Sequence, residues 1–313
     1  MNKKYAIEVP IYSSSIEHLI ELNRLEDIDI VMYGGVPNSV LNGGRLNLFL
    51  DGLFIWNRLL FSLTKKQLSK ALSKFYNAVT KANQNGIPFR IAFTNMFVSQ
   101  EELNEENLYP VKWLVESSQK YGVKNGIIIT NKLLEDFIRQ KYKDKLVYVS
   151  SCTKYYSPDK VLTPQETLSM YLEDSLKYDF IVMTPQDSRR ENLLKEVLRA
   201  SMCGVTAICN CWCAFKCNSY HHYKCFSNIN KKSLLNIGYT SFPFLVNAIT
   251  FQMLRGYKCP LFLALFQPFR NVHIEKTAKM QLAAGIVSFK VGRGLGADFL
   301  DRLVSLILEF KAS

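Results

Sequence analysis

Short apolar, β-branched runs alternate along the chain with longer segments of helical periodicity. This alternation is the pattern of repeated βα units around a parallel sheet. Eight runs are predicted to be strands, at residues 6–9, 28–33, 89–93, 126–130, 146–150, 180–184, 205–210 and 287–291. Seven segments are predicted to be helices, at residues 16–25, 66–85, 109–121, 132–141, 164–178, 192–202 and 297–310. Eight strands with helices between them predict an α/β fold, a (β/α)8 TIM-like barrel.

The chain is long enough for one barrel of this kind. It has 313 residues and 48% of them are apolar, which is sufficient for the core of a barrel of roughly 250 residues or more. We therefore predict a single domain over residues 1–313. Two connections are longer than the rest, at residues 34–65 and 211–285. Because long excursions in compact domains are usually functional, we expect residues 211–285 to form a Cys-rich segment inserted at the barrel mouth.

Composition and charge give expectations for location and partners. Glu8 and Pro10 interrupt the apolar stretch that a secretory signal needs, and Pro243, Asn247 and Gln252 interrupt the longest uncharged segment. We expect a cytoplasmic protein with no membrane span. The net charge of +12 suits an anionic metabolite, nucleic acid or an acidic partner. The basic residues are spread along the chain without an RNA-recognition signature, which disfavours nucleic acid.

Nearly every predicted strand is followed by polar residues. In a parallel barrel, catalytic and binding groups gather at the carboxyl ends of the strands. Amide side chains at these positions also cap helices, and this alternative accounts less well for Asn95, Asn131 and Asn210 together. It does not account for Lys290 and Arg293. We therefore predict substrate binding by the three asparagines and catalytic roles for Lys290 and Arg293.

Further basic residues are candidates for binding an anionic or oxygen-rich substrate. Arg45 follows a Gly-Gly pair whose bare backbone can approach a ligand, and Arg189 and Arg190 can bind a carboxylate or phosphate bidentately. The alternative for Arg189 and Arg190 is a solvated first turn of a helix. Lys290, if buried, would have a readily shifted pKa, or it would form an ion pair with Asp187.

Five of the eight cysteines lie close together, at Cys209, Cys211, Cys213, Cys217 and Cys225. A disulfide scaffold is not expected in a chain that can build an ordinary core. The cysteines therefore indicate a metal or iron–sulfur centre in a reducing compartment, because thiolates bind iron–sulfur clusters and zinc alike.

Other uses of the cysteines are weaker. Cys203 and Cys209 fit ordinary buried thiols. Cys152 follows a predicted strand and is a candidate nucleophile, but no histidine is tied to it by sequence. Radical-SAM chemistry is disfavoured because Tyr220 stands at the third position of the Cys-x3-Cys-x2-Cys signature.

The order of several short motifs resembles that of the U32 (collagenase-like) peptidase family over nearly the whole chain. The branch that is most similar is poorly characterised and often accompanies polysaccharide or natural-product biosynthesis genes. The motifs are Val9-Pro10, Tyr33-Gly34-Gly35, Gly43-Gly44-Arg45, Asn85 to Phe89 leading to Asn95, Ser150-Ser151, Asp187 to Arg190, Asn210 before Cys213-x3-Cys217, and Phe289 to Arg293. The sequence departs from the family at Asn218 and Tyr220, where proline and arginine are common.

The resemblance implies a TIM-like barrel and, in several members, a [4Fe–4S] cluster held by four cysteines. Matching Asn210 to the family asparagine makes Cys213 and Cys217 the central pair of ligands, with Cys225 and Cys259 completing the set. The zinc alternative uses Cys213, Cys217 and Cys225 with His221 or His222. Studied relatives include proteins for oxygen-independent hydroxylation of ubiquinone precursors, tRNA or ribosomal RNA.

Three functions remain open at this stage. The leading hypothesis is an iron–sulfur-dependent enzyme that carries out redox chemistry, such as oxygen-independent hydroxylation, on a small metabolite or biosynthetic intermediate, with an electron donor or partner protein. The second is a non-catalytic metal-binding barrel that assists a biosynthetic complex. The third is a peptidase, for which the sequence shows neither a helical histidine pair flanking a glutamate nor a convincing Ser/His/Asp set.

Overall fold

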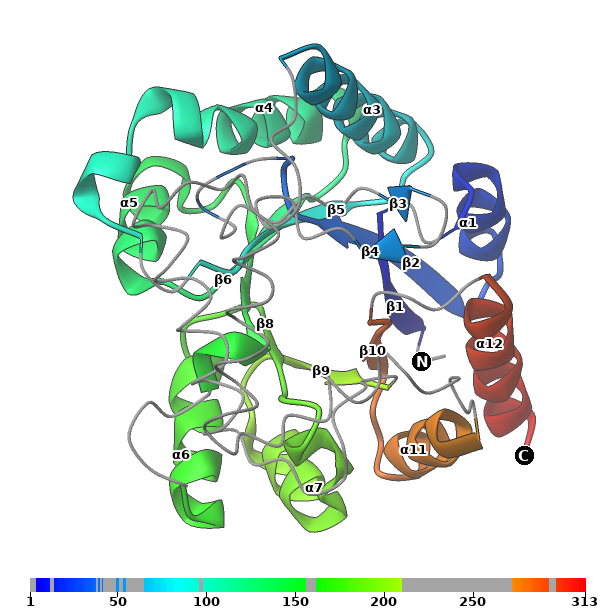
Figure 1. The fold of residues 1–313 in the computed structure, drawn as a ribbon. Coiled ribbons are helices and arrows are strands. Elements are labelled where there is room, and N and C mark those ends of the chain that lie inside the picture. The colour runs from blue at the N-terminus through cyan, green and yellow to red at the C-terminus, as the bar shows by residue number, and fades with distance from the viewer. Residues whose placement is uncertain are drawn as a thin grey trace, which may run out of the picture. The chain divides into compact units, whose positions relative to one another are not determined.

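The computed structural model describes residues 4–11, 14–37, 39, 41, 49–50, 53–54, 65–95, 98–155, 162–209, 272–292 and 297–313. Eight strands close into a parallel barrel (Figure 1). Their spatial order is β1 (Tyr5–Pro10), β10 (Ser288–Lys290), β9 (Gly204–Ile208), β8 (Phe180–Val182), β7 (Val147–Ser150), β6 (Gly126–Ile129), β5 (Phe89–Phe93) and β2 (Ile28–Gly34). This order confirms the predicted barrel and all eight predicted strands.

The chain divides into two compact units, and the boundaries that fall among the described residues lie within β2 and β7. The prediction of a single domain therefore stays a prediction. The described helices of the first unit are α1 (Ile16–Asn23), α6 (Pro164–Ser175), α7 (Glu191–Ala200), α11 (Val272–Ala283) and α12 (Ala297–Ala312), with the 3-10 turns η3 (Cys152–Tyr155) and η4 (Asp187–Arg189). Those of the second unit are α3 (Lys65–Gln84), α4 (Glu105–Tyr121), α5 (Lys132–Tyr142) and the 3-10 turn η2 (Gln100–Glu102), beside the two-stranded β3 (Phe49–Leu50) and β4 (Leu53–Phe54).

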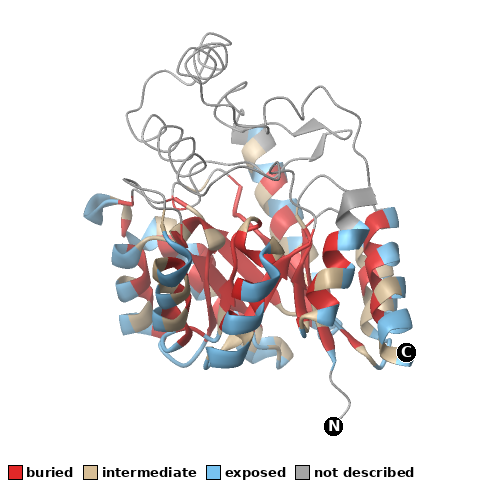
Figure 2. Ribbon diagram, turned by 90° about the horizontal axis from the view of Figure 1, so that it is seen from below, coloured by how far each residue is buried: buried red, intermediate tan, exposed pale blue. Residues whose placement is uncertain are grey.

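Buried residues concentrate on the strands, and exposed residues lie on the sides of the helices that face away from the strands (Figure 2). The strands are nearly continuous apolar runs because parallel strands that carry helices on one face and a barrel interior on the other are buried on both sides. In β5 all five residues are buried, and β6 is buried throughout. Strands β5 and β6 pair in register from Arg90 opposite Gly126 to Phe93 opposite Ile129.

Local chemistry sets several helix ends where the sequence predicted them. Thr163 and Glu166 form a reciprocal capping box at the start of α6, with Pro164 at the first helical position. Gly122 ends α4 in the left-handed conformation, with φ of 67°, which a residue with a Cβ adopts only at a cost.

One barrel helix was not predicted. Helix α11 occupies residues 272–283, within the segment 211–285 that was expected to be an inserted excursion, and it packs against α12, α7 and η4. The rest of that segment, residues 211–271, lies outside the described residues. Among the residues that are described, no helix is both long and apolar enough to cross a membrane.

Candidate functional site

The register of three neighbouring strands builds a polar row near their carboxyl ends. Ser288 of β10 lies opposite Ala6 of β1 and Thr206 of β9, and one pleat further along Lys290 lies opposite Glu8 and Ile208. Side chains of residues in register stand on the same face of a sheet. The Thr206 and Ser288 hydroxyls hydrogen-bond each other at 2.9 Å, so this face carries paired polar groups on adjacent strands.

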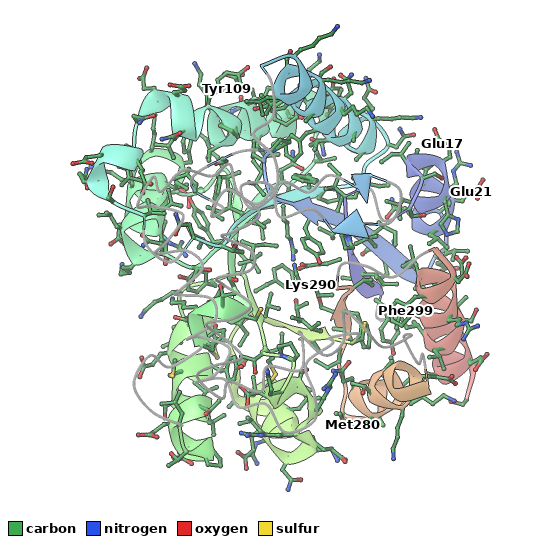
Figure 3. The ribbon with its side chains drawn as sticks, viewed as in Figure 1. Glu17, Glu21, Tyr109, Met280, Lys290 and Phe299 are labelled. Atoms are coloured by element: carbon green, nitrogen blue, oxygen red, sulfur yellow. The ribbon has the colours of Figure 1, made fainter. Side chains whose placement is uncertain are left out.

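A buried ion pair occupies this face. Lys290 Nζ donates to Glu8 Oε2 at 2.5 Å, and the two side chains are 10% and 0% exposed. Lys290 is the last residue of β10 and lies at the carboxyl end where sites of parallel barrels are built. Figure 3 labels Lys290 beside β10. Burying two charges is costly even when they are paired, so an ion pair at such a place is a functional candidate rather than a device for stability.

The observed partner of Lys290 is therefore Glu8 of β1, whereas the sequence suggested Asp187. The carboxylate of Asp187 already has two donors near the turn after β8. Its Oδ2 accepts from Thr184 Oγ1 at 2.7 Å and from the OH of Tyr171 on α6 at 2.9 Å. Its Oδ1 lies 3.4 Å from the guanidinium of Arg190. Burial, with the Asp187 carboxylate adding to it, raises the pKa of Tyr171 well above its usual value. Tyr171 therefore stays a neutral donor that fixes the turn after β8.

The same turn and the adjoining α11 hold polar groups that no described residue satisfies. Both side-chain amide atoms of Gln186 are buried without a hydrogen-bond partner among the residues that the structure describes. Gln281 of α11 is fully buried and donates to the carbonyls of Ser188 and Ile208, while its Oε1 has no partner within the same residues. Buried unsatisfied polar atoms cost free energy and are uncommon in folded proteins. Water or a ligand would account for them.

Two predicted binding residues belong to the second unit. Asn131 is the N-cap of α5, and its side chain accepts from Leu134 N at 3.0 Å. Asn95 is 1% exposed and its backbone N–H donates to the carbonyl of Leu41. The capping alternative therefore applies to Asn131. Arg189 lies half-buried in η4 of the first unit.

The residues after β7 are engaged with helix α6. Ser150 is fully buried, donates to Asp174 Oδ2 and accepts from Tyr155 OH, each at 2.8 Å. Lys154 completes the cluster at 2.9 Å from Asp174 Oδ1. These bonds anchor η3 to α6. The half-buried thiol of Cys152 lies within η3.

The described cysteines do not form a metal site. No group of three or more His, Cys, Asp or Glu side chains converges within the part of the chain that the structure describes. Burial raises the pKa of Cys203 to about 11 and that of Cys209 to about 12, so both are neutral thiols at pH 7 and poor metal ligands. This agrees with the interpretation of both residues as ordinary buried thiols.

Most of the expected metal and binding residues lie outside the described residues. These are Arg45, Asn210, Arg293, Cys211, Cys213, Cys217, Cys225, Cys259, His221 and His222. Their roles stay predictions.

Sequence reasoning identified Lys290 but missed its partner and the two glutamines. Glu8 carried a signal, because it is a charged residue inside the otherwise apolar strand Tyr5–Pro10. Gln186 and Gln281 carried none, since the packing of α11 against η4 brings together residues that are far apart in the sequence.

Comparison with solved structures finds distant likenesses, and a U32 peptidase is among them. The solved structure of that peptidase is similar to this chain with a TM-score of 0.42 and 14% sequence identity, over 75% of this chain and 80% of that chain. No family model matches the sequence, and no curated protein is significantly similar to it.

Proposed function

We propose that this protein is an enzyme that acts on a small anionic or oxygen-rich substrate at the carboxyl ends of β8, β9 and β10. The observation that carries the proposal is the Glu8–Lys290 ion pair, buried on the strand face and at the last residue of β10. A lysine held in this way offers a substrate carboxylate or phosphate a cationic partner in a site of low dielectric, where such contacts are strong.

The pair also supplies proton-transfer chemistry. A substrate anion that binds Lys290 Nζ competes with Glu8 for the ammonium, and the buried Glu8 carboxylate can then accept a proton from the substrate. Lysine and glutamate then act as an electrostatic clamp and a general base.

We further propose that the reaction is iron–sulfur-dependent redox chemistry, such as an oxygen-independent hydroxylation, and that Cys213, Cys217, Cys225 and Cys259 hold a [4Fe–4S] cluster. The density of cysteines between residues 209 and 225 and the order of the sequence motifs support this assignment. These four cysteines and Cys211 all follow β9 in the sequence. The cluster, when bound, would supply one-electron transfer.

Metal content tests the cluster. We expect protein purified without oxygen to contain iron and acid-labile sulfide and to be brown, and Cys217→Ser to lose both. Cys203→Ser is the matched control, because it also removes one thiol and should keep the iron of the wild type. If the protein contains zinc and no acid-labile sulfide, the site is a zinc site and not an iron–sulfur cluster. Equal iron contents in Cys217→Ser and Cys203→Ser would refute the proposed set of four cysteine ligands.

Anion binding tests the role of Lys290 independently of the metal. We expect calorimetric titration with oxalate to show binding to the wild type and at least a tenfold weaker binding to Lys290→Met. Lys132→Met is the control, since Lys132 is exposed and pairs with Asp136 on α5. The proposal fails if the two variants bind oxalate equally.

A further inference from the structure

We propose that the outer face of α3, together with the adjoining aromatic edge of α4, is a docking surface for an acidic segment of a partner protein. Helix α3 carries five lysines and no acidic residue. Lys66, Lys70, Lys74 and Lys81 are all exposed. Lys66, Lys70 and Lys74 form no ion pair with any described residue. This proposal concerns the second unit alone and does not depend on the proposed function.

The spacing of these lysines makes them one stripe. Lys66, Lys70 and Lys74 are four residues apart, which corresponds to steps of about 6 Å along a helix and to a drift of roughly 40° per step. Lys81 comes seven residues, or nearly two turns, after Lys74, so it lies on the same side of the helix, between the directions of Lys70 and Lys74. The opposite side of the helix is its core face, where Ala71, Phe75, Val79 and Ala82 are each at most 4% exposed. We call the four exposed lysines the α3 lysine stripe.

An aromatic cluster joins α3 to α4, roughly 80° around α3 from the edge of the stripe at Lys66. The ring of Tyr76 lies 4.6 Å from that of Trp113 and 6.4 Å from that of Tyr109, measured between centroids. Tyr109 is 52% exposed although it is large and aromatic, and Figure 3 shows it on α4 beside α3. Burial, and then the neighbouring Tyr109, raises the pKa of Tyr76 to about 12. Exposed Tyr and Trp side chains beside charged groups are typical anchors of protein–protein interfaces.

The charges beyond the aromatic cluster favour a protein over a polyanion. Helix α4 exposes the carboxylates of Glu105, Glu106 and Glu116 among its own lysines, so the purely basic surface ends where α4 begins. A nucleic acid or an anionic membrane extends past that boundary and would meet these carboxylates. Neither α3 nor α4 contains arginine, the side chain best suited to bidentate phosphate contacts. A partner segment with a row of Asp or Glu beside an apolar row matches the pattern.

Binding of a designed peptide tests this surface. The probe is a labelled 20-residue helical peptide with glutamates at every fourth position and leucines on the adjoining face, and a scrambled peptide of equal composition is its control. We expect full-length protein to bind the patterned peptide at least tenfold more tightly than the scrambled one at low salt. Lys66→Gln/Lys70→Gln/Lys74→Gln should weaken that binding about tenfold or more, by loss of three charge contacts, and Tyr109→Ala should weaken it severalfold.

The matched control is Lys120→Gln/Lys124→Gln/Lys143→Gln, which removes three exposed lysines of the same unit without touching the stripe. Its binding should equal that of the wild type. Equal binding by the two triple variants, or equal binding of the patterned and scrambled peptides, would overturn the proposal. So would tighter binding of poly(U) RNA or of phosphatidylserine vesicles that the stripe variant loses, because the surface would then serve a polyanion.

Discussion

Replacement of Lys290 by methionine should destabilise the protein strongly, because it removes a cation that pairs with the buried Glu8 carboxylate. Glu8 is 0% exposed and Lys290 is its partner at 2.5 Å. Removing one member of a buried pair costs about 3–5 kcal/mol, whereas replacing both by uncharged side chains costs far less. We therefore expect Lys290→Met to lose about 3–5 kcal/mol in the free energy of unfolding, and Glu8→Gln/Lys290→Met to recover most of that loss.

Urea unfolding followed by circular dichroism measures the free energy of unfolding of both variants. A cost below about 1 kcal/mol, or a double variant no more stable than Lys290→Met, would refute the assignment of a buried charge pair.

Two further outcomes follow from single residues. Asn131→Ala should cost about 0.5–2 kcal/mol and Asn131→Asp much less, because aspartate also caps α5; thermal unfolding measures both, and equal losses would show that Asn131 does more than cap. Cys203 and Cys209 should react with iodoacetamide far more slowly than a free cysteine at pH 8, since burial raises the pKa of the first to about 11 and of the second to about 12. Mass spectrometry of the modified peptides measures this, and rapid labelling of Cys209 in the folded protein would contradict its burial.

The strands were predictable because a parallel barrel leaves a direct mark on the sequence. Strands buried on both faces become apolar runs, and Phe89–Phe93 was predicted with its observed bounds. Helix α11 was missed because the apolar residues of its sequence do not recur at the spacing of a single helical stripe. The barrel is closed by pairing between strands that are far apart in the sequence, but the alternation of strand and helix patterns along the chain is enough to predict it.

One member of the buried ion pair, Lys290, was predicted from the sequence, and the other, Glu8, was not. Lys290 stood out as a cation at a strand end, but its partner lies 282 residues earlier, and only the register of β1 against β10 brings the two together. Asn131 shows the opposite case, since its amide serves the helix that follows it directly. An amide side chain after a strand can therefore cap the next helix instead of binding a substrate, as Asn131 does. A charged side chain such as Lys290 is the better indicator of a site at a strand end.

The most direct test of the central claim is the protection of Lys290 by a bound anion. Acetic anhydride modifies lysines, and mass spectrometry of the digested protein reports the rate at each one. We predict that oxalate slows the modification of Lys290 and leaves that of the exposed Lys132 unchanged. Equal rates at Lys290 with and without oxalate, under conditions in which calorimetry shows oxalate bound, would place the anion elsewhere and contradict the proposed site.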